Sequence, residues 1–235
     1  EDANMVFITA GMGGGTGTGA APIIVDIAKK QGALTVAVIT KPFSFEGDRR
    51  KQQAERGLQQ LERKVDTMIV VENDKLLSSI YGNLSLEKSF QLADEALCQG
   101  VQGISEIINV PGLINVDFAD IKSIISGGGI SFMAIGEGKG KSAVTDAIEK
   151  ALSNPLFDTP LKGASNVLFN IKGGKDLSIG QVHEVADIIK NSSGTHAQVI
   201  FGVVQDKKWK KRARITLVGT GVTSQKRQES KSLAT

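Results

Sequence analysis

The chain has 235 residues, a formal net charge of +3 at pH 7 and a hydrophobic fraction of 40%, which is typical of a folded protein of one large or two small domains. These values exclude an intrinsically disordered chain, and no apolar run approaches the roughly 20 residues that cross a bilayer, so we expect no direct membrane insertion. The small net charge argues against a nucleic-acid partner, and the single cysteine, Cys98, excludes an internal disulfide framework and a cysteine-rich zinc site.

The first hundred residues alternate between strand and helix patterns. Short apolar runs rich in β-branched residues predict strands at residues 5–9, 34–40 and 67–71, and helical patterns lie between them at residues 20–30 and 49–64. This alternation predicts a parallel sheet covered by helices.

A long helix separates this part from the rest of the chain. Residues 85–108 are apolar on more than one side, which predicts a central helix buried between two layers. The patterns beyond it predict helices at residues 118–125, 143–153 and 179–190, and strands at residues 130–135, 166–171, 198–204 and 214–219.

We therefore expect an α/β fold with two domains. Residues 1–110 form a Rossmann-like parallel-sheet domain that includes the central helix, and residues 111–222 form a second domain with a mixed sheet. Residues 223–235 are polar, lack aromatic side chains and are predicted to form a disordered tail. Because the chain begins at Glu1 and enters a strand pattern at Met5, we expect the first domain to be truncated.

Six glycines crowd into the nine residues that join the first strand to the first helix. The run reads GMGGGTGTG over residues 11–19. Glycine lets a ligand touch the main chain, and the free N–H groups at a helix N-terminus favour an anion. A tight turn would need only one or two glycines, and each one costs up to about 1 kcal/mol relative to alanine. The run therefore predicts a phosphate-binding loop.

Two familiar phosphate loops fit this run poorly. A Walker A loop would place a lysine after its last glycine, and none follows here. Gly15, Gly17 and Ala20 fit the looser dinucleotide pattern G-x-G-x-x-A, but no acidic residue ends the second strand to hold a ribose.

Residues 13–19, GGGTGTG, instead resemble the signature of the tubulin/FtsZ superfamily of GTPases. Residues 41–47, 73–77 and 115–120 resemble further segments of its FtsZ branch, the tubulin-like GTPases of bacterial cell division, in the same order over about 220 residues. The resemblance implies a tubulin/FtsZ-like fold that binds GTP or GDP with Mg²⁺, whose protein ligands stay unassigned. It also implies a cytoplasmic protein located at the mid-cell division site.

The resemblance assigns nucleotide contacts to residues of the first half. It implies that the phosphates lie on the loop, that Glu46 contacts ribose and Arg50 the nucleotide, that Asn73 contacts the nucleoside, and that Asp94 recognises the guanine edge. Taken alone, Glu46 and Arg50 read as a surface ion pair, Asn73 as a turn or N-cap residue, and Asp94 as a solvent-facing carboxylate. The phosphate contacts fall on Gly13, Gly14, Gly15, Thr16, Gly17 and Thr18.

Asn115, Asp117 and Asp120 are the candidate catalytic residues. Taken alone, Asp117 reads as an N-cap with Asp120 in the first helical turn. The resemblance implies that this loop enters the nucleotide pocket of the next subunit and directs the attacking water there. Hydrolysis would then require a head-to-tail homopolymer. The resemblance also implies cell-division proteins and membrane tethers as partners.

Three features depart from the resemblance or compete with it. Residues 136–142, GEGKGKS, nearly spell a P-loop that would use Lys141, but the spacing is one residue short, which favours a glycine-rich turn. Residues 207–214 are basic around Trp209, where the family usually has acidic or mixed residues, and we expect a solvated hairpin turn. The N-terminal phosphate loop of the family is absent, so we expect weak or no GTP binding by this chain alone, and a non-hydrolysing interaction module is the alternative function.

Overall fold

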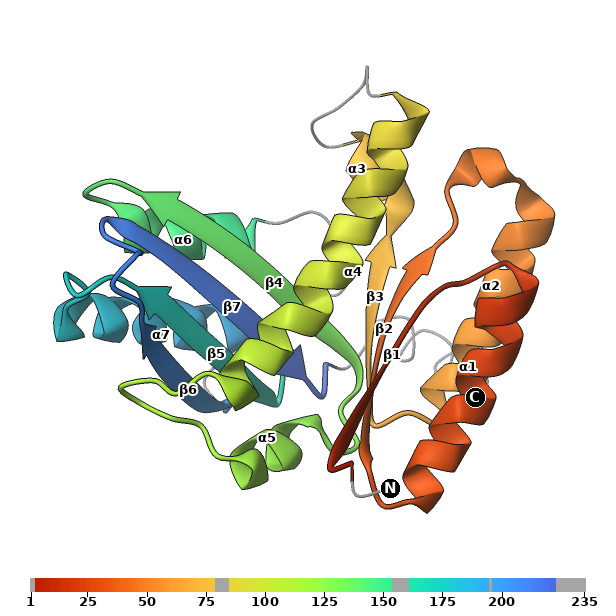
Figure 1. The fold of residues 1–235 in the computed structure, drawn as a ribbon, viewed down its shortest axis with the longest axis horizontal. Coiled ribbons are helices and arrows are strands. Elements are labelled where there is room, and N and C mark those ends of the chain that lie inside the picture. The colour runs from red at the N-terminus through yellow and green to blue at the C-terminus, as the bar shows by residue number, and fades with distance from the viewer. Residues whose placement is uncertain (1–2, 79–84, 154–160, 195, 223–235) are drawn as a thin grey trace, which may run out of the picture.

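The computed structural model describes residues 3–78, 85–153, 161–194 and 196–222 (Figure 1). The predicted tail, residues 223–235, lies outside the described residues. In chain order the elements of the first part are β1 (Met5–Gly11), α1 (Gly15–Lys30), β2 (Leu34–Lys41), the short 3-10 helix η1 (Ser44–Glu46), α2 (Asp48–Glu62), β3 (Thr67–Glu72), α3 (Asn73–Ser78) and α4 (Leu86–Asn109). They are followed by α5 (Phe118–Ile125), β4 (Gly129–Lys139), α6 (Ala143–Leu152), β5 (Asn166–Gly173), α7 (Ile179–Ser193), β6 (Gln198–Gln205) and β7 (Arg212–Thr220).

The described strands form one seven-stranded sheet in the order β1-β2-β3-β4-β7-β5-β6. Strands β1, β2 and β3 are parallel, and β4 joins β3 in parallel over only three residue pairs, from Thr67–Gly129 to Ile69–Ser131. Beyond that point β4 pairs antiparallel with β7, which pairs antiparallel with β5, while β5 and β6 are parallel. The expected α/β fold, with a parallel first half and a mixed second half, is confirmed.

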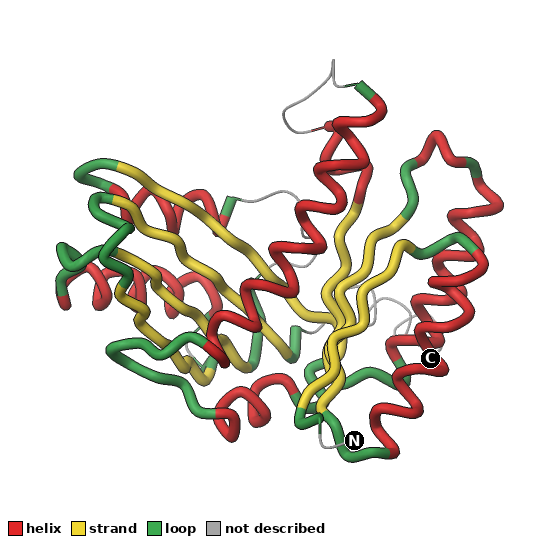
Figure 2. Tube along the Cα trace, in the orientation of Figure 1, coloured by secondary structure: helices red, strands yellow, loops and turns green. Residues whose placement is uncertain are grey.

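Helices cover both faces of the first half of the sheet. Figures 1 and 2 show α1 and α2 side by side on one face, where Val25 and Leu61 are fully buried, and α4 on the other face. Two glycines let α4 approach the sheet closely. A Cβ atom at Gly100 would lie 2.6 Å from Val38 Cγ1, and one at Gly103 would lie 2.7 Å from Met133 Cε. Helix α4 therefore packs against both halves of the sheet. The expected burial between two layers is wrong, because one side of the helix, with Asp94, Cys98 and Gln102, is exposed. Among the described residues, no helix is both long and apolar enough to cross a bilayer.

Residues 136–139 belong to a strand and not to the glycine-rich turn that we expected, and the competing P-loop reading is wrong as well. Gly136 and Gly138 lie inside β4, which continues to Lys139, so this segment is a strand and not a loop around a phosphate. A Cβ atom at Gly136 would lie 1.9 Å from the carbonyl oxygen of Ala147, and one at Gly138 would lie 1.9 Å from that of Ala143. Both glycines therefore serve the close approach of α6 to β4.

Candidate functional site

The glycine run forms a fixed main-chain loop at the carboxyl ends of β1 and β2. Met12 N donates to the carbonyl oxygen of Thr40 at 3.0 Å, and Gly13 N donates to Thr18 Oγ1 at 2.9 Å. Gln53 Nε2 on α2 donates to the carbonyl oxygen of Gly14 at 3.1 Å. Thr18 is buried, so its hydroxyl group stabilises the loop from inside the protein by accepting the hydrogen bond of Gly13 N. Open parallel sheets bind ligands at this edge.

Two glycines of the run are required by the fold itself. Gly13 has φ +104°, and a Cβ atom there would lie 2.9 Å from the carbonyl oxygen of Arg50. A Cβ atom at Gly17 would lie 2.6 Å from the carbonyl oxygen of Gly11. A tight turn is therefore sufficient to explain the glycines at positions 13 and 17, without a phosphate.

Gly14 and Gly15 have no such explanation within the described structure. Neither has a positive φ, and a Cβ atom at either position would meet no described atom within 4 Å. Both residues and Thr16 are exposed. Helix α1 begins here, earlier than the predicted residue 20, with no side-chain cap and no acidic residue in its first turn. Bare N–H groups of a helix N-terminus, left open by glycine, fit a phosphate.

Glu46 and Arg50 lie beside this loop and bind each other. Arg50 NH1 lies 2.5 Å from Glu46 Oε2, and Glu46 Oε1 accepts a hydrogen bond from Phe43 N at 2.9 Å. Arg50 is also the residue whose carbonyl group contacts Gly13. The structure therefore brings this pair to the glycine loop and shows the ion pair that the residues alone suggested, while their contacts with a nucleotide stay a prediction.

Asn73 carries a buried polar atom without a described partner. It is 5% exposed, it begins α3 directly after β3, and its Oδ1 makes no hydrogen bond among the described residues. It lines a hollow of about 120 Å³ with Lys41, Pro42 and Glu72. An unsatisfied buried acceptor costs about 1–3 kcal/mol, so a donor group of a ligand would remove a real penalty here.

Three phenylalanines connect η1 to the start of α4. The ring of Phe43 is stacked on Phe45 at 5.0 Å and meets Phe90 edge-on at 5.4 Å. Phe45 and Phe90 are 54% and 43% exposed. Phe90 lies four residues before Asp94 on α4, so both share one helix face. Sequence reasoning missed these rings, although two phenylalanines in KPFSFEG and one a turn before Asp94 were a usable signal.

Asp94 itself is exposed on α4, one helical turn after Phe90. The contact between Phe90 and Phe43 places the first half of α4 against the segment that carries Glu46. The predicted nucleotide residues therefore gather at one edge of the first half of the sheet, although they come from five different elements, α1, η1, α2, α3 and α4.

The predicted catalytic residues lie at the other end of the molecule. Asp117 Oδ1 caps α5 by accepting a hydrogen bond from Asp120 N at 2.9 Å, and Asn115 Oδ1 accepts from Gly112 N at 2.7 Å. Helix α4 runs from the α3 side to this end (Figure 1). From Asp94 to Asn109 it rises about 22 Å at 1.5 Å per residue. One chain therefore does not bring its own carboxylates to its own glycine loop.

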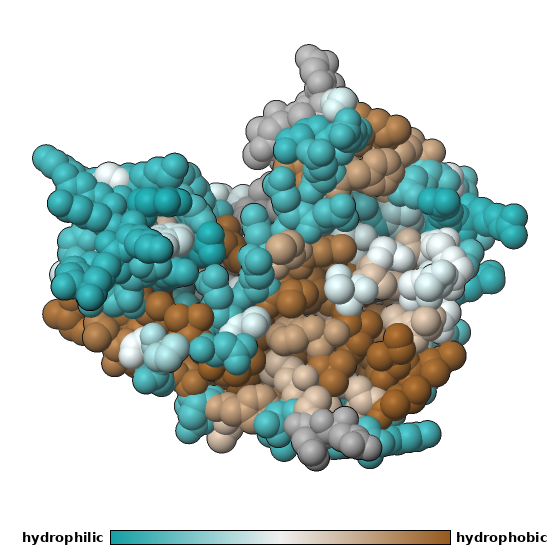
Figure 3. Space-filling model, viewed as in Figure 1, coloured by the Kyte–Doolittle hydropathy of each residue, from teal (hydrophilic) through white to brown (hydrophobic). Residues whose placement is uncertain are grey.

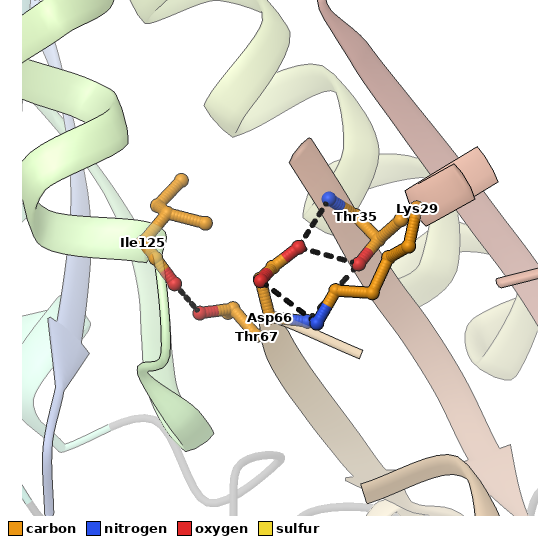
Figure 4. Close-up of polar contacts among 5 residues, drawn as sticks. All are labelled: Lys29, Thr35, Asp66, Thr67 and Ile125. Carbon is orange, nitrogen blue, oxygen red and sulfur yellow. Dashed lines mark hydrogen bonds and ion pairs between the residues drawn. The ribbon is translucent and has the colours of Figure 1, made fainter. Parts of the chain in front are cut away.

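Two buried threonines fix α5 in place. Thr67 Oγ1 donates to the carbonyl oxygen of Ile125 at 2.7 Å (Figure 4), and Thr220 Oγ1 donates to that of Ile124 at 2.7 Å. These carbonyl groups end the helix and lack a partner within it. Since Thr67 begins β3 and Thr220 ends β7, the helix with Asp120 is tied to both halves of the sheet.

Comparison with known proteins matches both parts of the chain. A model described as the GTPase domain of the Tubulin/FtsZ family matches residues 1–81, and one described as the C-terminal domain of the FtsZ family matches residues 129–223. The empty FtsZ dimer of M. jannaschii is similar at 42% identity and a TM-score of 0.88, over 95% of this chain and 65% of that one. This chain has the tubulin/FtsZ fold and is FtsZ-like.

Other solved structures agree with this fold. A mutant FtsZ of M. jannaschii is 42% identical with a TM-score of 0.87, over 94% of the FtsZ-like chain and 66% of its own. The GDP-bound monomer of CetZ1 from Haloferax volcanii is 22% identical with a TM-score of 0.77, over 97% and 68% of the two chains. The FtsZ-like chain thus spans about two thirds of these structures. The matched family model describes a GTPase domain, which supports the general kind of reaction that the resemblance implied.

Within the described ranges, no group of three or more His, Cys, Asp or Glu residues is placed to hold a metal ion. A Mg²⁺ ion that arrives with a nucleotide is held largely by phosphate oxygens and water. The exposed N–H groups at Gly14, Gly15 and Thr16 fit the phosphates that would carry it.

Asp66 links β2 to β3 next to the threonine that anchors α5 (Figure 4). Its Oδ2 accepts hydrogen bonds from Thr35 N at 2.9 Å and Thr35 Oγ1 at 2.7 Å, and Lys29 Nζ lies 3.0 Å from Oδ1. Burial raises the pKa of Asp66, but the hydrogen bonds from Thr35 and the charge of Lys29 outweigh burial and lower the pKa below its ordinary value.

Asp66→Asn is expected to lower the free energy of unfolding by about 1–3 kcal/mol at pH 7, because the amide loses the charge that Thr35 and Lys29 stabilise. A carboxyl group with a lowered folded pKa stabilises the fold above its unfolded pKa of about 3.9 and loses that contribution as the pH falls through the folded value. The difference from wild type should shrink below about pH 4. Urea unfolding at a series of pH values measures this difference in the free energy of unfolding. Asp187→Asn is the control, because Asp187 is exposed. A difference that does not change with pH contradicts this account.

Proposed function

We propose that this FtsZ-like protein binds GTP at its glycine loop and hydrolyses it between the subunits of a head-to-tail filament in bacterial cell division. The observation that carries the proposal is the separation of the two candidate sites. The glycine loop follows the end of β1, whereas Asp120 lies on α5, beyond the other end of the sheet. We call the region of residues 115–120 the acidic end. Such a split site is completed only when the acidic end of one subunit meets the glycine loop of another.

The nucleotide end offers a contact for each part of GTP. The N–H groups at Gly14, Gly15 and Thr16 would bind phosphate oxygens, with Arg50 beside the loop as a cation. Asn73 would use its unpaired Oδ1 on a donor of the nucleoside. The exposed carboxylate of Asp94 would accept two N–H groups of guanine, an edge that adenine does not offer. The exposed ring of Phe90 adds a flat apolar face for the base.

Among the three candidate catalytic side chains, Asp120 is the one for which no hydrogen bond is seen within the described residues. Asn115 Oδ1 and Asp117 Oδ1 each accept a main-chain hydrogen bond that shapes the loop. The carboxylate of Asp120 makes no hydrogen bond or ion pair within the part of the chain that the structure describes, so it is free to orient a water molecule. Phosphoryl transfer depends mainly on such positioning and on electrostatic stabilisation, and Mg²⁺ supplies charge neutralisation when it is bound.

Apolar side chains surround the acidic end and suit a subunit contact. Val110, Leu113 and Ile114 are 36%, 67% and 38% exposed, and all three precede Asn115 within five residues. Exposed apolar groups next to a half-complete site favour burial against another protein surface. Filament formation, a cytoplasmic location at mid-cell, and binding to cell-division proteins and membrane tethers all belong to this proposal. Support for self-association comes from relatives solved as an FtsZ dimer and as a GTPγS-bound CetZ2 protofilament.

Hydrolysis between subunits predicts that GTPase activity per molecule rises with protein concentration, because the complete site forms only on contact. Phosphate release over a hundredfold concentration range, with light scattering in GTP and in GDP, measures this. Leu113→Glu should move the rise to higher concentration, since a charge in the contact weakens it. The alternative, a non-hydrolysing interaction module, predicts no phosphate release at any concentration. Activity per molecule that is constant with concentration would show a site complete within one chain.

A further inference from the structure

Seven lysines gather at the end of the second half where β4, β5 and β6 finish and β7 begins. All seven are exposed, and we call this surface the cationic end. Four of them lie in or beside the β6–β7 turn, two at the β4–α6 connection and one at the β5–α7 connection. Figure 3 shows hydrophilic surface over this upper left part of the molecule. Its members are Lys139, Lys141, Lys175, Lys207, Lys208, Lys210 and Lys211.

Main-chain hydrogen bonds hold the three connections together. Gly140 N donates to the carbonyl oxygen of Lys211 at 2.9 Å, Lys211 N donates to Asp176 Oδ2 at 3.1 Å, and Asp206 N donates to the carbonyl oxygen of Gly173 at 2.9 Å. The lysines therefore project from a fixed frame, which is more than the solvated hairpin turn expected from the sequence.

The backbone of Lys211 adds a second observation. Lys211 has φ 53°, and no other non-glycine residue among those described has a positive φ. Glycine or asparagine would fit this conformation with less strain, so a lysine here places a cation at an energetic cost. Lys211 lines a hollow of about 200 Å³ together with Lys141, Arg212 and one acidic residue, Asp176. Outliers of this kind point to a use for the side chain.

The charge of the cationic end is not neutralised within the described chain. Arg212 and Arg214 pair with Glu137, but none of the seven lysines forms an ion pair among the described residues. The two carboxylates nearest in sequence, Asp176 and Asp206, each bind a main-chain N–H group of the turn. The surface therefore presents an excess of positive charge to its surroundings.

We propose that the cationic end adsorbs to the surface of a bilayer that contains anionic lipids. Ile179, the first residue of α7, is 79% exposed directly after the β5–α7 connection, so an apolar side chain accompanies the lysines. Lysine clusters with an exposed apolar residue are typical of peripheral binding to anionic membranes. Single-stranded nucleic acid would need free aromatic rings, and the ring of Trp209 is covered by Lys172, Arg212 and Arg214 at 4.9–5.1 Å.

Vesicle co-sedimentation of the full chain tests this inference independently of GTP hydrolysis. Binding to phosphatidylcholine vesicles with roughly 40% phosphatidylglycerol should exceed binding to pure phosphatidylcholine vesicles by more than about tenfold and fall as salt is raised. The triple change Lys207→Glu, Lys208→Glu and Lys210→Glu should lower the partition coefficient more than about tenfold. Ile179→Ser should lower it in both low and high salt, because it removes apolar contact and not charge.

A matched variant separates this surface from net charge. Lys30, Lys162 and Lys190 are exposed and lie outside the cationic end, so their change to Glu alters the net charge equally. The inference is supported if this control keeps wild-type vesicle binding and both triple variants keep the far-UV spectrum and melting temperature of the wild type. It is overturned if the control loses binding equally, if neutral vesicles bind as well as anionic ones, or if the chain binds a single-stranded DNA oligonucleotide more tightly than it binds anionic vesicles.

Discussion

Asp120→Ala is expected to lower GTP turnover by roughly 10²–10⁴-fold, the range typical of a lost catalytic acid or base. The affinity for GTP should stay within about twofold of wild type, because in the proposed arrangement the nucleotide of a subunit contacts its own glycine loop and not its own α5. The substitution removes only the carboxylate of Asp120, which makes no hydrogen bond with a described residue. Its helix, α5, stays held by the hydrogen bonds from Thr67 and Thr220.

The measurement is phosphate release at saturating GTP in the complete protein, beside equilibrium titration with a fluorescent guanine nucleotide. Asp146→Ala is a matched control, since Asp146 is also an acidic residue in the first turn of a helix, α6, at the other end of the second half. Turnover that is undiminished, or an equal loss in both variants, contradicts the role assigned to Asp120.

Gly15→Ala is expected to weaken GTP binding by about 10–100-fold, because the added methyl group would keep a phosphate oxygen away from the main-chain N–H groups. The expected loss equals one charge-assisted hydrogen bond of about 1.5–3 kcal/mol. Without a ligand, the substitution is expected to leave the free energy of unfolding unchanged or to raise it. A Cβ atom at Gly15 meets no described atom within 4 Å, and alanine in a helix is favoured over glycine by up to about 1 kcal/mol. A variant that is as stable as wild type and binds GTP poorly would assign the effect to the ligand.

Calorimetric titration with GTP, with ATP as the comparison, and thermal unfolding without nucleotide together measure this prediction. Gly180→Ala is the matched control, because Gly180 is an exposed glycine in the first turn of α7 with only Ser178 Oγ within 4 Å of its Cβ position. Unchanged GTP affinity of the Gly15 variant would mean that the phosphates lie elsewhere. A variant that unfolds at a lower temperature would show that the main chain around Gly15 is tighter than its open surroundings suggest.

A test in trans follows from these two variants. Each lacks a different half of the split site, so a mixture places an intact glycine loop against an intact α5 in about one in four contacts between subunits. Activity of the mixture above that of either variant alone is the expected result. A mixture that stays as inactive as its components would mean that both halves act within one subunit.

Local patterns were enough for the types and order of most elements. Alternating apolar runs predicted the strands, and the long apolar stretch predicted α4. The predicted boundaries were wrong where glycine was taken to end an element. Helix α1 begins within the glycine run at Gly15, and β4 continues through Gly136 and Gly138, where α6 packs closely against the strand. Helix α3 was missed because its six residues follow β3 without a loop and are too few to show a helical period.

The candidate site could be predicted only as a set of residues. The glycine run and the acids of residues 115–120 are visible in the sequence, but their separation depends on the direction of α4 and on the pairing of β3 with β4, whose paired residues are about 60 positions apart. The pairing of Glu46 with Arg50 followed from their spacing of four residues, whereas the unpaired Oδ1 of Asn73 depends on packing between elements that no local pattern describes.

The double attachment of α5 makes the acidic end sensitive to bending of the molecule. The seam between β3 and β4 is only three residue pairs long, which makes it the natural hinge between the two halves. If the halves pivoted there, Thr67 and Thr220 would pull the last turn of α5 in different directions, and one of the two hydrogen bonds would stretch or break. The carboxylate of Asp120 would then keep its position only within a narrow range of hinge angles. In the proposed filament, curved subunits would therefore hydrolyse GTP more slowly than straight ones.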